Sequence, residues 1–399
     1  MPPLDILKPP YHNVDPLALG NQGAVAIDVD FDELGSMHKR PGLWPFWRLG
    51  VMNGVDGLFW WPDKQQLIVV IAGRVLAFAS LTAAPTEATT TECRLAINQP
   101  VQFASLGAQL FMVNGSRMVR YLGTGKCEYM NEADDPGEVD YIAAYNGRII
   151  ANERGASRGL FTEYVPPTDT TRPKWVLTDD LTPEANSDPL TSILNYGSEI
   201  LLGGPRSLEF WQDVGSSPNP FVRSSFMLEF GVASPNSMVI ANGAAFWMTQ
   251  DRRIMSLTGH NPTIISLPIE DELKALRNPG DCKAFLLDHY VVFTFPTDNI
   301  TWVFDYISAN WVRWGFWNSD VGAYERYLGQ NAVYVPAWST WFVGGKYNGQ
   351  LLVSSPNMCT DLGNPIRSAW VSAIVDHGGH NWKLSAELSL KFKNAGWKS

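Results

Sequence analysis

The hydrophobic and polar positions of the chain alternate in short runs that predict β-strands rather than helices. The clearest example is the stretch Cys282–Trp317, CKAFLLDHYVVFTFPTDNITWVFDYISANWVRWGFW. Tyr290–Phe295 and Ile300–Phe304 are rich in β-branched and aromatic residues, and the turn cluster Pro296–Asn299 separates them. Strands that follow one another this closely pair with their sequence neighbours, so the stretch predicts an antiparallel sheet.

The same unit of three or four short strands recurs along most of the chain. The first strand of each unit is predicted near Phe59, Phe103, Ile142, Leu194, Val239, Phe285 and Val333, at spacings of 44, 39, 52, 45, 46 and 48 residues. A period of roughly 40–50 residues with three or four strands per repeat is typical of a β-propeller. We therefore predict an all-β protein built on a propeller of about six to seven three- or four-stranded blades. A β-sandwich is the alternative, but it rarely holds so many strands in one domain.

A few segments between the predicted strands have their own signals. The pairs Asn114-Gly115, Asn146-Gly147 and Asn242-Gly243 predict tight hairpin turns. The polar, Thr-rich segment Thr82–Glu92 is interpreted as a long loop. One helix is predicted over Ile269–Arg277, between Pro268 and Pro279, as a connector between two blades.

The two ends of the chain depart from the repeat. Five prolines within Met1–Leu19 predict an extended arm, and Ala24–Phe31 alternates as an edge-type strand would. Two further strands are predicted at Arg367–Asp376 and Lys383–Lys393. The expected organisation is therefore an arm with edge strands at 1–50, a propeller at 51–356 and C-terminal β-strands at 357–399.

Closure of the propeller gives these end segments a predicted role. A propeller that is not closed leaves an exposed edge strand that is open to aggregation, and neither end is long enough to form its own core. We therefore predict that Ala24–Phe31 or Leu43–Leu49 pairs with strands from Arg367–Phe392. The pairing would form a small β-layer built from the N- and C-terminal segments beside the propeller.

Composition and charge narrow the class of protein. Apolar residues make up 45% of the chain and charged residues 18%, which excludes a disordered polyelectrolyte. Forty acidic and thirty basic residues give a net charge of −10, so the chain has no net excess of positive charge for binding nucleic acid. No signal-peptide pattern and no apolar run long enough for a membrane-spanning helix are found.

The cysteines give no sign of a metal site. Cys93, Cys127, Cys282 and Cys359 lie far apart in the sequence, so no CxxC spacing occurs. We interpret them as reduced thiols of the core, which fits assembly in a reducing cytoplasm.

Two further patterns suggest metal chemistry, but each has a simpler interpretation. Residues 28–32, DVDFD, resemble the start of a calcium loop, yet Glu33 and Lys39 stand where such a loop needs Gly and Glu. We interpret these acids as exposed on an edge strand. His377 and His380 flank two glycines next to Asp376, and we interpret them as exposed histidines of a turn.

No enzyme motif appears. The chain has no G-x-S-x-G elbow, no GxGxxG opening a helix and no phosphate-binding Walker loop. The tryptophans Trp302, Trp311, Trp314 and Trp317 are interpreted chiefly as blade core, with a subunit interface or a carbohydrate platform as alternatives. No catalytic residue, cofactor or metal ligand is therefore predicted.

Two stretches resemble a known family. Arg206–Val239, RSLEFWQDVGSSPNPFVRSSFMLEFGVASPNSMV, and Asp288–Trp314, DHYVVFTFPTDNITWVFDYISANWVRW, are similar to tail hub (nozzle) proteins of short-tailed bacteriophages, also called packaged-DNA stabilisation proteins. A weaker similarity covers Arg40–Ala79, where RPGLWPF precedes the first propeller strand. The resemblance is strongest over Ile193–Trp317.

The resemblance implies a structural role without catalytic residues. Members of this family are expected to form a homo-hexamer below the portal and adaptor ring, to continue the DNA channel and to retain the packaged genome. They are also expected to anchor tail fibres, spikes or a needle. The implied location is the virion tail, after assembly in the host bacterial cytoplasm. The alternative is a carbohydrate-active or carbohydrate-binding propeller, or an unrelated propeller scaffold.

The charge of the chain fits a channel through which DNA slides. A ring of six would carry about −60 charges before counterions bind, and acidic groups in its lumen would repel phosphates. The loop Asn131–Glu138, with Glu132, Asp134, Asp135 and Glu138, is a candidate for such a surface.

Overall fold

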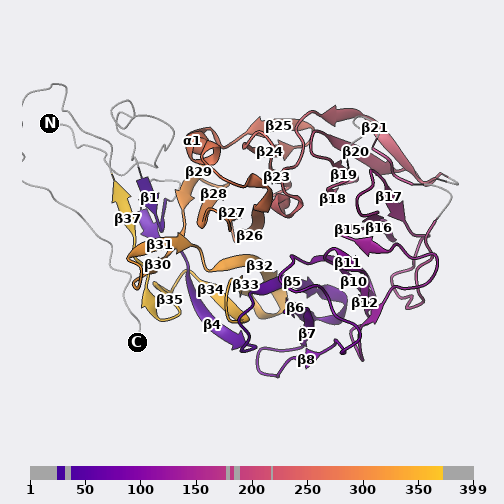
Figure 1. Cartoon of the computed structure of the whole chain (residues 1–399), viewed down its shortest axis with the longest axis horizontal. Helices are drawn as coiled ribbons and strands as arrows, with labels where there is room; N and C mark the ends of the chain where they lie inside the picture. Colours follow the sequence, from indigo (N-terminus) through magenta and orange to yellow (C-terminus); the bar gives the residue numbers. More distant parts are fainter. Residues whose placement is uncertain (1–24, 32–36, 177–179, 184–188, 217–218, 372–399) are drawn as a thin grey trace, which may run out of the picture.

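The computed structural model describes residues 25–31, 37–176, 180–183, 189–216 and 219–371. Seven sheets follow one another around a central axis and form a β-propeller (Figure 1). This confirms the predicted fold class. Each of the seven predicted first strands falls within the first strand of one blade, because the turn residues and the alternating apolar runs that mark the repeat are local features.

The first three blades are built from short antiparallel strands. Blade 1 contains β5 (Val55–Trp61), β6 (Gln66–Ile71), β7 (Arg74–Phe78) and β8 (Thr86–Glu87). Blade 2 contains β9 (Gln102–Leu106), β10 (Gln109–Val113), β12 (Val119–Tyr121) and β13 (Glu128–Tyr129), next to a two-stranded sheet of β11 (Ser116–Arg117) and β14 (Glu138–Val139). Blade 3 contains β15 (Ile142–Tyr145), β16 (Arg148–Asn152) and β17 (Gly159–Phe161).

Blades 4 and 5 each have four strands. Blade 4 contains β18 (Ser192–Tyr196), β19 (Glu199–Gly203), β20 (Leu208–Asp213) and β21 (Phe221–Leu228). Blade 5 contains β22 (Val239–Ala241), β23 (Ala244–Met248), β24 (Ile254–Thr258) and β25 (Asn261–Ile264).

Blades 6 and 7 are extended to six strands by the chain ends. Blade 6 runs in the order β26 (Lys283–Leu287), β27 (Tyr290–Phe295), β28 (Ile300–Asp305), β29 (Asn310–Arg313), β1 (Val25–Ile27) and β37 (Ala369–Val371). Blade 7 runs in the order β32 (Gly329–Val335), β33 (Thr340–Gly345), β34 (Gln350–Ser355), β4 (Gly42–Arg48), β35 (Thr360–Asp361) and β36 (Asn364–Pro365). Two hairpins lie beside them, β2 (Val29–Phe31) with β3 (Met37–Lys39) and β30 (Gly315–Asn318) with β31 (Ala323–Arg326).

The core is divided among the contacts between neighbouring blades. Among the described residues there are seven clusters of buried apolar side chains, and each joins side chains from two adjacent blades. Strands in the middle of a blade are therefore buried on both faces: β10, β19 and β27 are buried at every residue. The sequences of such strands are nearly continuous apolar runs. A strict alternation of apolar and polar residues would instead indicate a sheet with one face exposed to solvent.

The predicted helix is present but shorter than expected. α1 spans Glu270–Lys274 and follows a 3-10 turn at Leu267–Ile269. The N–H of Leu276 bonds to the carbonyl of Leu273, so the chain tightens after Lys274 instead of continuing the α-helix. Ile269, Leu273 and Leu276 are buried in the cluster between blades 5 and 6, as a connector requires. The other 3-10 turns are Pro62–Lys64, Pro235–Ser237, Pro279–Asp281 and Pro336–Trp338.

One predicted turn and one predicted loop differ from the structure in detail. Asn146-Gly147 and Asn242-Gly243 have positive φ at both residues, as a tight type I′ hairpin needs. At Asn114-Gly115 only the glycine does, because the Asn114 side chain bonds to both backbone groups of Ala96 instead. The segment Thr82–Glu92, expected to be a loop, contains β8, which pairs with β7.

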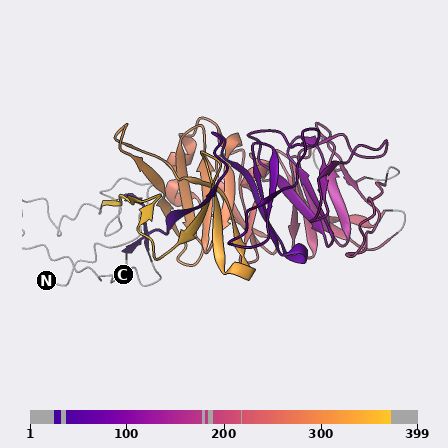
Figure 2. The same cartoon turned by 90° about the horizontal axis from the view of Figure 1, so that it is seen from below.

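The first and last segments of the chain close the propeller. β4, expected in the N-terminal layer, pairs antiparallel with β34 and is a strand of the last blade. β1 pairs antiparallel with β37, which confirms the predicted pairing of Ala24–Phe31 with Arg367–Phe392. The layer continues blades 6 and 7 at one side of the disc (Figure 2). The strand predicted at Lys383–Lys393 lies outside the described residues.

Candidate functional site: the buried junction of the chain ends

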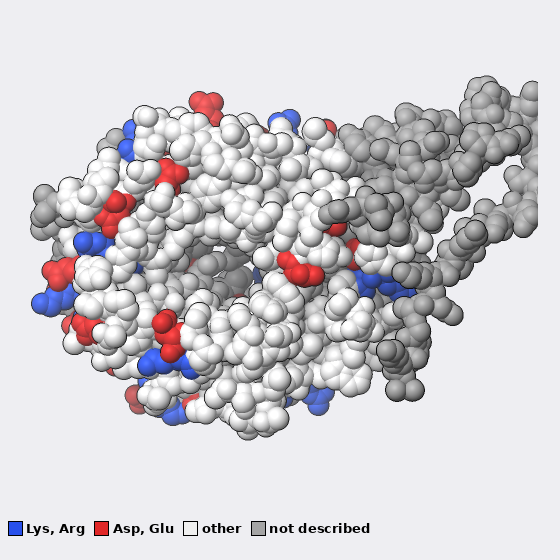
Figure 3. Space-filling view, turned by 180° about the vertical axis from the view of Figure 1, so that it is seen from behind, with Lys and Arg blue, Asp and Glu red and all other residues white. Residues whose placement is uncertain are grey.

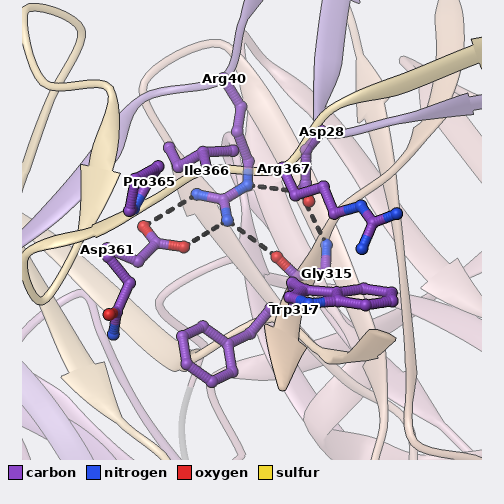
Figure 4. A pocket seen from close by; sticks show the side chains of 10 residues that line it. Asp28, Arg40, Gly315, Trp317, Asp361, Pro365, Ile366 and Arg367 are labelled. Atoms are coloured by element: carbon purple, nitrogen blue, oxygen red, sulfur yellow. Dashed lines mark hydrogen bonds and ion pairs between the residues drawn. The ribbon is translucent and has the colours of Figure 1, made fainter. Parts of the chain in front are cut away.

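A fully buried arginine lies where the two ends of the chain meet. Arg40 is only 1% exposed, and its guanidinium group makes five hydrogen bonds. Figure 4 shows those to Asp28, Asp361 and Gly315. Nε donates to Asp28 at 2.6 Å, and the two Nη atoms donate to the Asp361 carboxylate at 3.1 and 2.5 Å. The remaining bonds go to the carbonyls of Pro41 at 3.1 Å and Gly315 at 2.8 Å. All five N–H donors of an arginine are thus satisfied.

Asp28 connects this cluster to blade 6 and to the C-terminal segment. Its φ of 55° lies in the left-handed region, where the chain bends between β1 and β2. The carboxylate accepts a second bond from the N–H of Gly315 at 2.8 Å. Its backbone N–H donates to Arg313 at 2.9 Å, and its carbonyl accepts the hydroxyl of Ser368 at 2.9 Å. One residue therefore joins three segments that are distant in sequence.

Asp361 makes the corresponding connection to blade 7. Besides the two bonds from Arg40, its carboxylate accepts the backbone N–H of Leu43 at 3.2 Å. The N–H of the next residue, Leu362, donates to the carbonyl of Leu43 at 2.9 Å. The C-terminal segment is thereby held parallel to β4, the strand that completes the last blade.

Aromatic rings and a further carboxylate surround the arginine. The guanidinium carbon lies 5.0 Å from the ring centre of Tyr327 and 5.9 Å from that of Trp314. Trp314 donates from Nε1 to Asp30 at 3.0 Å. Burial raises the pKa of Asp30 to about 7, although Trp314, Tyr290 and Arg40 act in the opposite direction. The Asp30 carboxyl is therefore partly protonated near neutral pH.

Burial also affects the charge of the acidic residues around Arg40. Burial raises the pKa of Asp28, which outweighs the attraction of the Arg40 charge and the hydrogen bond from Gly315. Asp28, Asp30 and Asp361 are each at most 2% exposed, so the cluster holds three carboxyl groups around one cation. Such a cluster is costly to break, because loss of one partner leaves a buried charge without compensation.

The outer side of the junction is a small pocket that opens to solvent. It is bordered by Arg40, Trp317 and the segment from Asn364 to Arg367 (Figure 4). The guanidinium carbon of Arg367 lies 3.8 Å from the Trp317 ring centre. The hydroxyl of Tyr324 donates to the carbonyl of Arg367 at 2.8 Å. The β30–β31 hairpin thus fixes the segment that leads into β37.

The structure corrects one interpretation made from the sequence and leaves another outside its range. Asp28 and Asp30 were expected on a solvent-exposed face, but both are buried because Arg40 and Trp314 bind them from inside. Within the described residues no group of three His, Cys, Asp or Glu side chains could hold a metal ion. His377 and His380 lie outside the described residues.

The tryptophans and cysteines lie mostly in the core. Trp302, Trp311 and Trp314 are buried, as predicted for blade core, and Trp317 is half-buried under Arg367. Cys93, Cys127 and Cys282 are buried and free, but Cys359 is exposed, contrary to the prediction of four core thiols.

The acidic loop proposed for a channel is balanced by arginines. Asp135 accepts a bond from Arg172 at 2.7 Å, and Glu138 accepts one from Arg154 at 2.7 Å. The orientation of this loop toward a lumen stays a prediction. Figure 3 shows acidic and basic side chains scattered over one face of the propeller, without a continuous basic area around the central hollow. No helix in the described part of the chain is long and apolar enough to cross a membrane.

Sequence reasoning did not find the Arg40 cluster. Its members are isolated charged residues in unremarkable surroundings, and Arg40 and Asp361 are separated by 321 positions. The sequence does show an RPG segment before the first blade and acidic residues in two short segments near the chain ends. This pattern does not indicate which acidic residue pairs with Arg40.

A family model matches most of the chain. The model described as bacteriophage P22 Gp10, β-propeller, matches residues 35–357, a range that runs from just before β3 to just after β34. No curated protein matches this chain in sequence.

Solved structures are similar in fold only. One is the extracellular domain of the putative one component system BT4673 from B. thetaiotaomicron, with 10% identity and a TM-score of 0.51. The similarity covers 78% of this chain and 39% of that one, so this chain spans about two fifths of its length. Another is the Pan2 WD40 domain of Neurospora crassa, with 9% identity and a TM-score of 0.47, covering 77% of this chain and 90% of that one.

Proposed function

This chain belongs to the bacteriophage P22 Gp10 β-propeller family, and we propose that it is a tail hub (nozzle) subunit of a short-tailed phage. The family is one of phage structural proteins, and the match across residues 35–357 is the observation that carries the proposal. Family membership makes the chain a structural protein of a phage. We further propose its position in the tail, its ring and its partners.

In this role about six copies form a closed ring, because a DNA channel requires rotational symmetry. The ring lies below the portal and adaptor, continues the channel and helps to retain the genome. Double-stranded DNA passes through without sequence-specific binding. The net charge of −10 per chain supports this, since a surface without a net basic excess holds phosphates weakly. Other surfaces of the ring anchor fibres, spikes or a needle.

The closed propeller suits a part that bears load. β4 is the first strand of the family-matched region that enters a blade, and it completes the last blade by pairing with β34. Opening the ring of blades at this point requires the loss of that pairing. The junction around Arg40 joins both chain ends to blades 6 and 7. We propose that this side of the molecule faces the portal and adaptor, because the family resemblance puts the continuation of the DNA channel there.

The proposed function is not enzymatic. A carbohydrate-binding or carbohydrate-active propeller was the alternative from the sequence, and its main support was the set of four tryptophans. Three of these are buried and one is half-covered by Arg367, which leaves no exposed aromatic platform among them. No observation therefore favours the alternative.

An image of the native particle tests the proposal. Cryo-electron microscopy of phage particles that contain this chain is expected to find it in a sixfold ring directly below the portal and adaptor. Density for the propeller elsewhere in the particle, or an assembly with twofold symmetry alone, would refute the assignment. A second test is biochemical: the chain is expected to co-purify with portal–adaptor complexes after the DNA has been released.

A further inference from the structure

Among the described strands, the outer strand of blade 4 is the longest edge strand with no partner on its outer side. β21 spans eight residues, Phe221–Leu228, and pairs only with β20 among the described strands. Val222 is 49% exposed and Met227 is 37% exposed along this strand. An edge of this kind presents a row of backbone donors and acceptors to any other strand that approaches it.

The other blades have outer edges that are short or covered. The outermost strands of blades 1, 2, 3 and 5 have two, two, three and four residues, and β25 of blade 5 also contains Pro262. In blade 6 the edge of β29 is partly covered by β1, and in blade 7 the edge of β4 is partly covered by β35, in each case through one residue pair. Short strands, prolines and covering segments are the usual means of protecting an edge. β21 has none of these three, but its pairing with β20 shifts register between Glu209 and Trp211, which places a β-bulge in the middle of the strand.

The side chains of β21 also do little to repel a partner strand. Arg223 is its only charged residue, and that side chain already bonds to Glu209 at 3.3 Å. Ser224 and Ser225 occupy the bulged middle of the strand, between the paired residues Arg223 and Met227, and their small side chains allow a second backbone to approach closely. A partner strand should therefore be uncharged and partly apolar.

A second open edge with these properties exists on the same chain. β37, Ala369–Val371, is the last strand of the blade 6 sheet, and beyond β1 no described strand pairs with it. All three of its residues are apolar, and Val371 is 52% exposed. Figure 1 places β37 and β21 near opposite ends of the long axis of the propeller. One chain therefore cannot pair these two edges with each other.

We propose that β37 of one copy of this chain adds to β21 of a second copy, so that blade 6 of one subunit and blade 4 of the next form one continuous sheet. Because the two edges differ and lie on different sides of the molecule, the contact is heterologous and repeats from subunit to subunit. The inference rests on the proposed ring and names the surfaces that form it. Main-chain hydrogen bonds supply the affinity in such strand addition, and the exposed Val222 and Met227 would be covered by the partner.

Cysteine cross-linking tests this contact directly. In a Cys359→Ser background, which removes the exposed native thiol, Ser225→Cys and Val371→Cys are made as separate proteins, one with a cleavable tag of different mass. The two proteins are mixed at high concentration and oxidised. We expect a mixed dimer at about twice the chain mass of 44.3 kDa. A chain that carries both Ser225→Cys and Val371→Cys should form a series of larger cross-linked oligomers. Thiol reduction should collapse both.

Matched variants separate this contact from random collision. Thr263→Cys, an exposed position on the outer strand of blade 5, replaces Ser225→Cys as a control and is expected to give no mixed dimer with Val371→Cys. Ser224→Pro, which removes an edge N–H, is expected to abolish the cross-link at position 225 while circular dichroism stays unchanged.

Three outcomes overturn the proposal: no mixed dimer at any concentration, an equal yield with the Thr263→Cys control, or Ser225→Cys dimers formed only with themselves. The last would indicate a twofold pairing of β21. None of these outcomes decides the proposed function, because particle imaging can find a tail ring built through other surfaces. Equally, a specific cross-link in a chain that imaging places outside the tail would keep the contact and remove the hub role.

Discussion

Arg40 and Asp361 lie 321 positions apart in the chain, yet they share hydrogen bonds of 3.1 and 2.5 Å inside the buried junction. The pair ties the segment before the first blade to the segment after the last one. Asp28 completes the cluster from the opposite side. The stability of the closed propeller should therefore depend on a site that belongs to none of its seven repeats.

Replacing Arg40 by Met should destabilise the protein strongly. The change leaves Asp28 and Asp361 buried without their cation, and breaking a buried pair in this way costs about 3–5 kcal/mol. Arg74→Met is the matched control, because the Arg74–Glu87 pair is about one third exposed and should contribute about 1 kcal/mol or less. Urea unfolding of both variants measures the difference, and equal losses would contradict a structural role for the junction.

The strand that closes the last blade should be sensitive at its inward-facing residue. Leu43 is fully buried between blades 6 and 7, and its replacement by Ala should cost about 2–5 kcal/mol. Trp44 is the next residue on β4 and is 51% exposed, so Trp44→Ala should cost clearly less despite its larger side chain. Thermal unfolding of the two variants compares them. A larger loss at Trp44 would mean that β4 faces the other way.

Asp30 should make stability fall as pH rises. The pKa of Asp30 is about 7 in the folded protein, against 3.8 for an unperturbed aspartate. Between pH 3.8 and pH 7 the folded state therefore keeps a proton that the unfolded state has lost. The free energy of unfolding then decreases with rising pH by up to about 1.4 kcal/mol per pH unit. Asp30→Asn should therefore gain stability relative to the original chain from pH 4 to pH 8. Parallel pH curves would refute this.

One thiol per chain should react under native conditions. Cys359 is exposed, whereas Cys93, Cys127 and Cys282 are buried. Burial also raises the pKa of Cys93 to about 11 and raises the pKa values of Cys127 and Cys282, which lowers the thiolate fraction of all three. Titration with a chromogenic disulfide is expected to count one thiol in buffer and four in denaturant, and Cys359→Ser should abolish the native signal.

Deleting Arg367–Ser399 should impair the protein or the particle. The deletion removes β37 and the Ser368 bond to Asp28, so it leaves β1 with an open edge. We expect insoluble chain, or particles that lose DNA. A truncation after Val375, which keeps β37, is the control and should stay soluble. A soluble chain that assembles and retains the genome after the larger deletion would show that the closing layer is dispensable.

The repeating part of the fold could be predicted because its signals are local. The first strands near Phe59, Phe103 and Phe285 were located by alternating apolar runs between turn residues, and the structure has β5, β9 and β26 there. The helix was found in the same way, since Ile269, Leu273 and Leu276 mark one face. Its early end was not predicted, because the change to a 3-10 turn depends on how the chain packs between two blades.

The closure and the junction were decided by tertiary structure. Sequence arguments gave the pairing of Ala24–Phe31 with Arg367–Phe392 from the need to protect an edge, and β1 and β37 do pair. They did not place β4 in the last blade, because its apolar pattern fits an edge layer equally well. They also assigned Asp28 and Asp30 to solvent, since acids on a short strand are usually exposed and nothing nearby marks Arg40 as their partner.

The physical reason for this division is the range of the interactions. Alternation and turn chemistry act over a few residues, so the sequence alone determined a propeller of short antiparallel strands. A buried ion pair between Arg40 and Asp361 is stable only after seven blades have brought the two ends of the chain together. Which charges are buried, which strand closes the ring and which edge stays open on β21 are therefore properties of the folded chain.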